Sequence, residues 1–355
     1  MTFSCLRAAI LPTLIAVLIT FGQTALAQKS PSLGKQPFTI GFYNAENLFD
    51  TEDDPKIIDE EYLPTSELKW DSIRYQAKLT NLSRVIDSLG GLAGPDLLGM
   101  CEIENRRVLI DLSNTKLLKP KGYSIIHQNS PDRRGIDVAL LYKTSSFKVL
   151  ESMWIPIKIA EDTAFRTRDI LAVRGVVLAN GKPTKDSIYI LVNHFPSRRG
   201  GQEASDGKRA AVATKVRAFI DFILSKQPNA KIIAMGDLND EPTDATLTEV
   251  LKAGAKPESA WPMGYLYNAM WDLKAAKQGT LFYRGDFNML DQMLLTEGFV
   301  KGKGIVVQGG GTIYNPHWVQ QHDEKYKGAP LRTYVGKRYF GGFSDHFPVY
   351  LHLSK

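Results

Sequence analysis

Residues 231–241 read KIIAMGDLNDE, a short apolar run that ends abruptly in a glycine and a group of polar residues. The run KIIAM has the length and composition of a buried β-strand. Because side chains two positions apart lie on the same side of a strand, Asp237 and Asn239 can face one ligand together. A capped turn would explain the same residues, so the ends of the other predicted strands decide between the two interpretations.

Apolar or alternating runs of the same kind recur along the chain and predict many strands. They are PFTIGFYN (37–44), PDLLGMCEIE (95–104), YSIIHQ (123–128), IDVALLYK (136–143), DILAVRGVVLA (169–179), SIYILVNHF (187–195), MLDQMLLT (289–296) and DHFPVYLHL (345–353). Apolar residues at helical spacing predict helices over 79–89 and 212–223. Many strands and few one-sided helices favour β-sheets packed together with helices outside.

Polar residues stand at the tips of nearly all these predicted strands. They are Asn44 and Glu46, Glu102 and Glu104, Asp137, Asn193 and His194, Asp237 and Asn239, Asp291, and Asp345 and His346. Carboxylates, amides and imidazoles are the groups that bind metal ions and transfer protons. One such tip can be a cap, but turns do not explain so many.

Six motifs occur together in one order: YNAEN (43–47), GMCEIEN (99–105), VNHF (192–195), GDLND (236–240), LDQMLL (290–295) and FSDHFPVYL (343–351). In this order the chain resembles the endonuclease/exonuclease/phosphatase superfamily, which is deoxyribonuclease I-like, and within it a secreted bacterial member. The resemblance covers about residues 38 to 353. It implies an α+β fold, a four-layer α/β/β/α sandwich of two mainly antiparallel sheets packed face to face with helices outside. It also implies divalent-metal-dependent hydrolysis of a phosphoester.

The resemblance further implies a metal site. Glu102 corresponds to the principal carboxylate ligand, and Asn44 and Asp345 are expected close to the metal or the phosphate. An oxygen-rich site of this kind suits Mg²⁺, the expected ion, with Mn²⁺ and Ca²⁺ as alternatives.

The catalytic residues implied by the resemblance are His194, Asp237, Asn239, Asp291 and His346. Asp237 orients or deprotonates the attacking water, Asn239 holds a phosphate oxygen, and Asp291 orients His346. The two histidines supply an acid and a base, and which is which stays open. These functions match what attack on a phosphodiester requires.

Other residues have competing interpretations. Asp137 either orients His194 or caps a strand, and Arg168 either contacts the substrate phosphate or is a surface charge; we take Arg168 as substrate-binding. Glu46 and Glu104 are expected to cap or pair, and Cys101 to be a buried strand residue. The histidines without motif context, read as surface or core residues, are His127, His317, His322 and His352.

The first residues differ from the rest of the chain. Arg7 precedes an apolar run over 8–22, and the small residues Ala25 and Ala27 follow it. We therefore expect a signal peptide over 1–27 cut near Ala27, a linker over 28–37, one domain over 38–355, and a secreted or periplasmic location. Cleavage would leave Cys101 as the only thiol, which excludes an intramolecular disulfide.

The sequence departs from the motifs of particular branches of the family, and these departures narrow the range of expected substrates. His194 stands where apurinic endonucleases typically have tyrosine, and Gln292 follows Asp291 where inositol phosphatases have arginine. The net charge of +6 and the pairs Arg133-Arg134 and Arg198-Arg199 are compatible with a polyanion. The expected function is a secreted nuclease acting on DNA or RNA as a monomer without a stable protein partner. The alternatives are a phosphoesterase for small molecules or lipids, and a non-catalytic binding module.

Overall fold

The computed structural model describes residue 1, residues 37–160 and residues 162–354. The predicted signal peptide and linker, apart from Met1 and Pro37, lie outside the described residues. Within these ranges, no helix has both the length and the apolar character needed to cross a membrane.

The first sheet has the strand order β14-β17-β1-β2-β4-β3. Its strands are β1 (Phe38–Leu48), β2 (Leu97–Ile103), β3 (Tyr123–His127), β4 (Asp137–Lys143), β14 (Val307–Ile313) and β17 (Val349–Leu353). Only β1 and β2 pair in parallel; the remaining pairs are antiparallel. The parallel pair places the carboxyl ends of β1 and β2 at the same edge of the sheet.

The second sheet has the order β5-β6-β7-β8-β13-β10-β9. Its strands are β5 (Phe147–Ile155), β6 (Ile170–Ala179), β7 (Lys182–His194), β8 (Lys231–Asp237), β9 (Ala253–Gly254), β10 (Leu266–Asn268) and β13 (Asp291–Leu295). Here β7 and β8 are parallel, as are β9 and β10, and the other pairs are antiparallel. Each sheet therefore contains one central parallel pair whose carboxyl ends carry predicted site residues.

The two sheets pack face to face through β1, β2 and β4 on one side and β7, β8 and β13 on the other. They approach closely at Gly99, where a Cβ atom would lie 2.7 Å from Met235 Cε and 3.2 Å from Val192 Cγ1. Side chains of both sheets and of two helices form one buried apolar cluster. The predicted face-to-face sandwich is confirmed.

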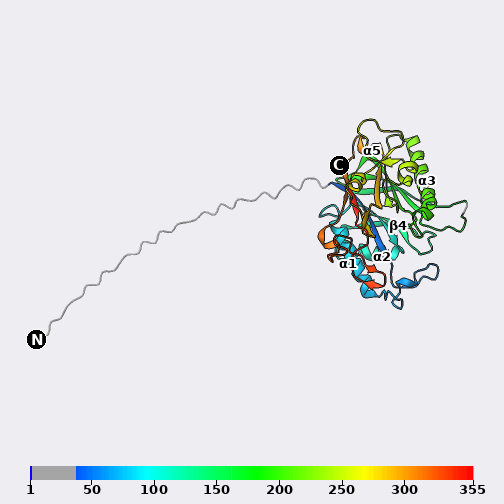
Figure 1. The fold of residues 1–355 in the computed structure, drawn as a ribbon. Coiled ribbons are helices and arrows are strands. Elements are labelled where there is room, and N and C mark those ends of the chain that lie inside the picture. The colour runs from blue at the N-terminus through cyan, green and yellow to red at the C-terminus, as the bar shows by residue number, and fades with distance from the viewer. Residues whose placement is uncertain (2–36, 161, 355) are drawn as a thin grey trace. The chain divides into compact units, whose positions relative to one another are not determined.

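Helices cover the outer faces. α1 (Ser72–Ser88) begins after Asp71, whose side chain accepts from the Arg74 backbone N–H, and it packs with α2 (Arg106–Ser113) on the first sheet. α3 (Gln202–Lys226) packs on the second sheet through Val212, Val216 and Ile220. Figure 1 shows α1 and α2 on one side of the strands and α3 on the other. The four layers are those that the sequence predicts.

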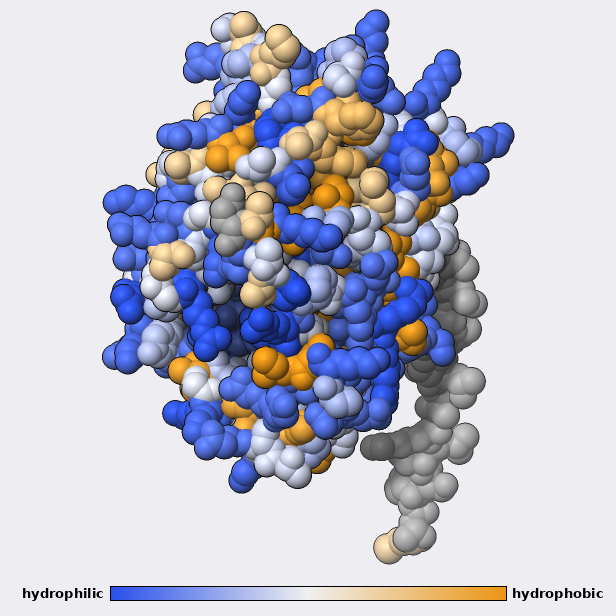
Figure 2. Space-filling view, turned by 90° about the vertical axis from the view of Figure 1, so that its right-hand side faces the viewer, coloured by the Kyte–Doolittle hydropathy of each residue, from blue (hydrophilic) through white to orange (hydrophobic). Residues whose placement is uncertain are grey.

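Figure 2 shows the side of the molecule that carries α3, where hydrophilic residues cover most of the surface and hydrophobic residues are exposed in smaller groups.

The shorter elements are α4 (Trp271–Ala275), α5 (Glu297–Val300), η1 (Glu60–Tyr62), η2 (Lys119–Lys121), η3 (Thr246–Val250), η4 (His317–Val319) and the hairpins β11 (Leu281–Tyr283) with β12 (Asp286–Asn288) and β15 (Tyr334–Val335) with β16 (Arg338–Tyr339).

Candidate active site

Strand register brings three predicted site residues side by side. His194 of β7 lies opposite Asp237 of β8, which in turn lies opposite Asp291 of β13. The glycine of GDLND permits this pairing, because a Cβ on Gly236 would lie 2.2 Å from the backbone oxygen of Asn193. Asn44 joins the two sheets, since its Nδ2 donates to Asp237 Oδ2 over 3.0 Å. Residues far apart in the sequence thus meet at one end of the sandwich.

The strand ends turn through unusual backbone conformations. Glu46, Asn47, Glu102 and Asn239 have φ between 51° and 58°, a left-handed region that non-glycine residues seldom adopt. Such conformations cost on the order of 1–3 kcal/mol each and persist where the surroundings enforce them. Here the Asn47 N–H donates to Glu102 Oε2 over 2.9 Å. These turns fix the direction of the Glu102 carboxylate.

His346 forms a buried pair with Asp291, with 2.6 Å between its Nδ1 and Asp291 Oδ2. Burial alone would lower the pKa of His346, but the charges of Asp291 and Asp237 together raise it well above its ordinary value. Its Nε2 lies 3.8 Å from Asp237 Oδ2. The surroundings of His346 therefore favour its protonated form.

The pKa of His194 is shifted in the opposite direction. Burial, and then the charges of Arg168 and Arg134, lower its pKa well below the ordinary value. Its Nε2 lies 3.7 Å from Asp237 Oδ2 and 3.9 Å from Glu102 Oε1. Its Nδ1 is buried and has no hydrogen-bond partner within the described ranges. The surroundings of His194 therefore favour its neutral form.

Asp237 lies between the two imidazoles. Burial raises its pKa to about 7, with the charges of Asp291 and Glu102 adding to the effect and that of His346 opposing it. Its Oδ1 accepts from the Asn239 backbone N–H over 3.0 Å. The Asn239 side chain is itself held, because its Nδ2 donates to the Phe195 carbonyl over 3.0 Å.

Further carboxylates gather on the side of the first sheet. Asp345 Oδ2 lies 3.6 Å from Arg332 Nη2. Glu46 is buried, accepts from the Thr333 N–H over 2.6 Å and lies 3.6 Å from Lys78 Nζ. Burial and the charge of Asp345 raise the pKa of Glu46 to about 7, although Lys78 opposes this. Negative charge at this edge is therefore only partly compensated.

The predicted metal ligands are placed around this edge. Asn44 Oδ1 accepts from the Glu46 N–H over 2.9 Å, and Glu102 lies beside His194 as described. Among His, Cys, Asp and Glu of the described chain, two groups have ligand atoms within 4.8 Å of one another: Asp237, Asp291 and His346, and Cys101, His194 and Asp237. Neither group contains Glu102 or Asp345. Burial first, and then neighbouring carboxylates, raise the pKa of Glu46 and of Asp237, and an oxygen-rich set of this kind fits a hard divalent cation.

Two sequence interpretations differ from the geometry. Asp137 Oδ2 lies 3.1 Å from His127 Nε2, and its Oδ1 accepts from the Ser130 N–H. The suggestion that Asp137 orients His194 is therefore wrong. Arg168 is buried, donates to the Phe195 carbonyl over 2.7 Å and pairs with Asp132 over 3.2 Å. It anchors the chain after β7 next to His194.

Sequence reasoning missed Lys78, whereas Arg134 belongs to an arginine pair that the sequence analysis had noted. Lys78 Nζ donates to Thr333 Oγ1 over 2.7 Å and to the Phe343 carbonyl over 2.8 Å, and so ties the chain before His346 to α1. Its position on the apolar stripe of α1, beside Leu79 and Leu82, is a signal that could have identified it. Arg134 donates to Asn47 Oδ1 at the other edge of the site.

Comparisons with known proteins agree with the fold described above. The profile of the Endonuclease/Exonuclease/phosphatase family matches residues 39–355. Similar solved structures include D. rerio TDP2 complexed with single strand DNA product, with 14% identity, a TM-score of 0.53 and coverage of 90% of this chain and 99% of that chain. TDP2 from C. elegans has 14% identity and a TM-score of 0.53, with 94% and 82% covered.

A further similar structure is the Bacteroides thetaiotaomicron mannosyl-6-phosphatase Bt3783, with 16% identity, a TM-score of 0.53 and coverage of 90% of this chain and 100% of that chain. At these identities the likeness establishes the fold. No curated protein matches the sequence.

Proposed function

The chain belongs to the endonuclease/exonuclease/phosphatase family, and we propose from this that it hydrolyses phosphodiesters in DNA or RNA. Membership makes it a metal-dependent phosphoester hydrolase; the nucleic-acid substrate is the proposal. One observation carries the reaction: Nε2 of His194 and Nε2 of His346 lie 3.7 Å and 3.8 Å from the same oxygen, Asp237 Oδ2. Two imidazoles whose pKa values are shifted in opposite directions, both close to one carboxylate, suit displacement at a phosphorus centre.

The protonation tendencies assign roles. Asp237, with its pKa raised to about 7, is partly ionised near neutrality and accepts a proton from, or orients, the attacking water. Cationic His346 donates toward the phosphoryl oxygens or the departing alkoxide, and Asp291 holds its ring through Nδ1. Neutral His194 either donates or accepts at its Nε2. The Asn239 amide, fixed by the Phe195 carbonyl, lies beside Asp237.

Glu102, Asp345 and Asn44 would hold the metal ion, with Mg²⁺ as our proposal. The bound cation offsets charge on the phosphoryl oxygens. The support is the concentration of carboxylates at this edge, where burial first, and then the charge of Asp345, raise the pKa of Glu46.

The nucleic-acid part of the proposal has separate support. Arg198 and Arg199 line a cavity that also includes Asn239. The net charge of +6 favours a polyanion. D. rerio TDP2, which has the same fold, was solved with a single-stranded DNA product. The similarity in fold to the mannosyl-6-phosphatase supports the alternative substrate, a small phosphoester.

One assay tests these proposals. Residues 28–355 are purified and incubated with Mg²⁺ and plasmid DNA, RNA, bis-p-nitrophenyl phosphate, mannose 6-phosphate or sphingomyelin. We expect cleavage of nucleic acid and of the diester, lost at least 100-fold in His194→Gln but not in the control His317→Gln, whose histidine is exposed. Activity on the monoester or lipid without cleavage of nucleic acid supports the alternative. No hydrolysis of any substrate refutes the proposed function.

We also propose that the chain is exported, supported by the apolar run over 8–22 and by Ala25 and Ala27. Expression in a bacterium, followed by fractionation and N-terminal sequencing, tests this. We expect a periplasmic or secreted product that begins near Gln28; an uncleaved cytoplasmic product would contradict the proposal.

A further inference from the structure

The β11–β12 hairpin is attached directly to the site. Leu281 forms an isolated β-bridge with His346, and the Phe347 N–H donates to the Thr280 carbonyl over 2.9 Å. Thr280 Oγ1 also accepts from the Asp291 N–H over 3.2 Å. The base of the hairpin therefore rests on both members of the buried His346–Asp291 pair, while its tip is exposed.

Two cavities lie against the tip of this hairpin. The first, of about 350 Å³, lies between the hairpin and residues 321–335, and we call it the 321–335 cavity. The second, of about 890 Å³, lies against residues 198–202, and we call it the 198–202 cavity. Tyr283 and Arg284 line both. The hairpin tip is thus a wall that the two cavities share.

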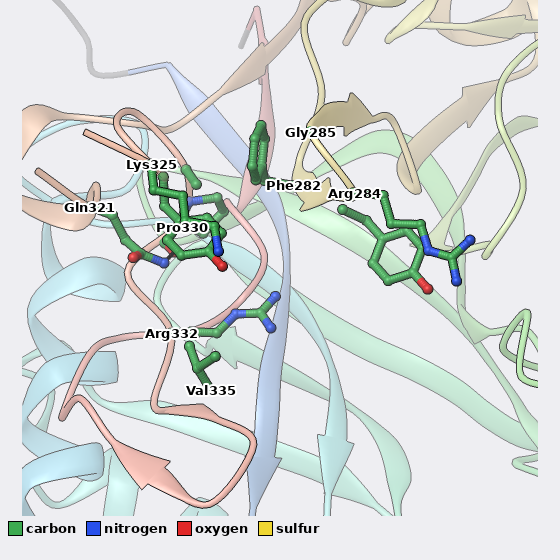
Figure 3. A pocket seen from close by; sticks show the side chains of 11 residues that line it. Phe282, Arg284, Gly285, Gln321, Lys325, Pro330, Arg332 and Val335 are labelled. Carbon is green, nitrogen blue, oxygen red and sulfur yellow. Dashed lines mark hydrogen bonds between the residues drawn. The ribbon is translucent and has the colours of Figure 1, made fainter. Parts of the chain in front are cut away.

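Each cavity reaches a different part of the site. The 321–335 cavity includes Arg332, whose guanidinium lies 3.6 Å from Asp345. Figure 3 shows Arg332 extending into the space between the 321–335 segment and the hairpin residues Phe282 and Arg284. The 198–202 cavity includes Asn239, next to Asp237. A chain that occupied both cavities would pass the hairpin tip that they share and would approach the site at both Asp345 and Asn239.

Both linings are cationic. The 321–335 cavity carries Lys325 and Arg332, the 198–202 cavity carries Arg198 and Arg199, and Arg284 belongs to both. Neither lining includes a carboxylate. In the described part of the chain, Arg199, Arg284 and Lys325 form no ion pair, so their charges are available for phosphates. A substrate with a phosphate on each side of the reacting one fits this arrangement.

The hairpin also offers planar surfaces. The Tyr283 side chain is 55% exposed, and the Arg284 guanidinium lies 5.3 Å from the centre of its ring. On the 321–335 side, Phe282 packs edge-on against Tyr326, with 6.5 Å between ring centres. Exposed aromatic rings beside cations bind the bases of single-stranded nucleic acid by stacking.

The turn at the tip is not the one that folding alone favours. Arg284 and Gly285 have φ of 53° and 100°. A two-residue turn with positive φ at both positions favours Asn, Asp or Gly at the first of them. Arginine is therefore unusual at this position, and it places a cation on the wall between the two cavities.

We propose that the β11–β12 hairpin separates two nucleotide subsites, so that a single strand crosses the site with nucleotides on both sides of the scissile phosphate. A base stacks on Tyr283, Arg284 contacts a neighbouring phosphate, and Arg332 with Lys325 and Arg199 contact the flanking phosphates. This inference rests on the proposed function and specifies its substrate as an internal phosphodiester of a flexible single strand.

The test compares single-stranded oligonucleotides of two and twelve nucleotides with bis-p-nitrophenyl phosphate, for Arg284→Gly and Tyr283→Ala. Glycine keeps the turn while removing the cation. The matched control is Lys252→Gly, another exposed cation with positive φ, 54°, which lines neither cavity.

We expect kcat/KM on the twelve-nucleotide strand to fall roughly tenfold in each hairpin variant, at least fivefold more than on bis-p-nitrophenyl phosphate. Arg284→Gly should also reduce the salt dependence of binding by about 0.7 in log-log slope, and Lys252→Gly should change neither quantity. Equal losses on all substrates, or no loss on the long strand, would overturn the inference. If wild-type protein hydrolyses bis-p-nitrophenyl phosphate but cleaves two and twelve nucleotides equally well, the subsites are refuted while phosphodiester hydrolysis stands.

Discussion

Replacing Asp291 by asparagine is the sharpest single test of the site. The carboxylate lies 2.6 Å from His346 Nδ1, is fully buried, and has a second oxygen, Oδ1, without a hydrogen-bond partner in the described ranges. Asparagine preserves the size of the side chain but removes the largest of the charges that raise the pKa of His346. The pKa of His346 should therefore fall, because burial is then opposed chiefly by Asp237 and Asp345, and His346 should hold its proton less strongly.

The expected loss in turnover is about 10²–10⁴-fold, the usual contribution of a positioned acid or base. This corresponds to about 3–5 kcal/mol at about 1.4 kcal/mol per tenfold. Because the pKa of His346 is raised in the folded protein, the pair stabilises the fold fully below the ordinary histidine pKa, and this contribution is lost only as pH rises through the raised value. Because the pKa of His346 is lower in the variant, the residual activity should increase as pH is lowered from 8 to 6 and the imidazole regains its proton.

The assay measures kcat on bis-p-nitrophenyl phosphate between pH 5 and 9, Mg²⁺ affinity by calorimetry, and Tm. Asp53→Asn, at an exposed position, is the matched control. We expect a large loss of kcat with Mg²⁺ affinity little changed. Near-normal turnover would show that Asp291 only caps β13, since asparagine caps nearly as well. A fall in Tm that accounts for the lost activity would place Asp291 in the scaffold.

Three further predictions concern the metal, the fold and a buried acid. EDTA should abolish activity, and Glu102→Gln should weaken Mg²⁺ binding and kcat together; full activity in either case would refute the metal role. Gly236→Ala should lower the free energy of unfolding by about 1–3 kcal/mol and reduce kcat, because its Cβ would meet the Asn193 carbonyl at 2.2 Å; unchanged urea unfolding would contradict this. Burial raises the pKa of Glu104 to about 8, so its stabilising, protonated form is lost as pH rises from 4.5 through 8. Glu104→Gln should therefore stabilise the protein by about 1–3 kcal/mol at pH 8 and little at pH 5, measured by urea unfolding, and equal effects at both pH values would refute the assignment.

Strands with buried faces could be predicted from the sequence because their apolar runs are continuous, as in β1, β2 and β8. The edge strand β5 was missed, since its exposed residues, including Glu151, interrupt the pattern. Residues 309–311 are all glycine, a composition typical of a loop, but they lie within β14, where the pairing with β17 shifts register. A Cβ on Gly311 would lie 2.3 Å from Met270 Sδ and 2.9 Å from the Ala269 backbone oxygen, a contact between distant segments that sequence does not reveal.

The candidate site was predictable to the extent that each residue belongs to a motif at a strand end. Its pairings were not, because they depend on register and burial. Asp137 pairs with His127 because antiparallel β3 and β4 place His127 opposite Ala139, two residues along the strand. Arg168 reads as a surface charge or phosphate ligand in sequence, yet it is buried through contacts with Asp132 and the Phe195 carbonyl.

The pairing of His194, Asp237 and Asp291 across β7, β8 and β13 has a consequence for how this enzyme can change over time. Neighbouring strands lie about 4.8 Å apart, so backbone hydrogen bonds, not side-chain reach, set the width of the catalytic centre. A shift of one residue in β8 would turn Asp237 to the opposite face and remove it from the site. Insertions in these strands should therefore be lethal to activity, whereas the hairpin and loops around them can be exchanged. New substrates would be acquired by exchanging the hairpin and loops around the catalytic centre, while the width of the centre stays constant.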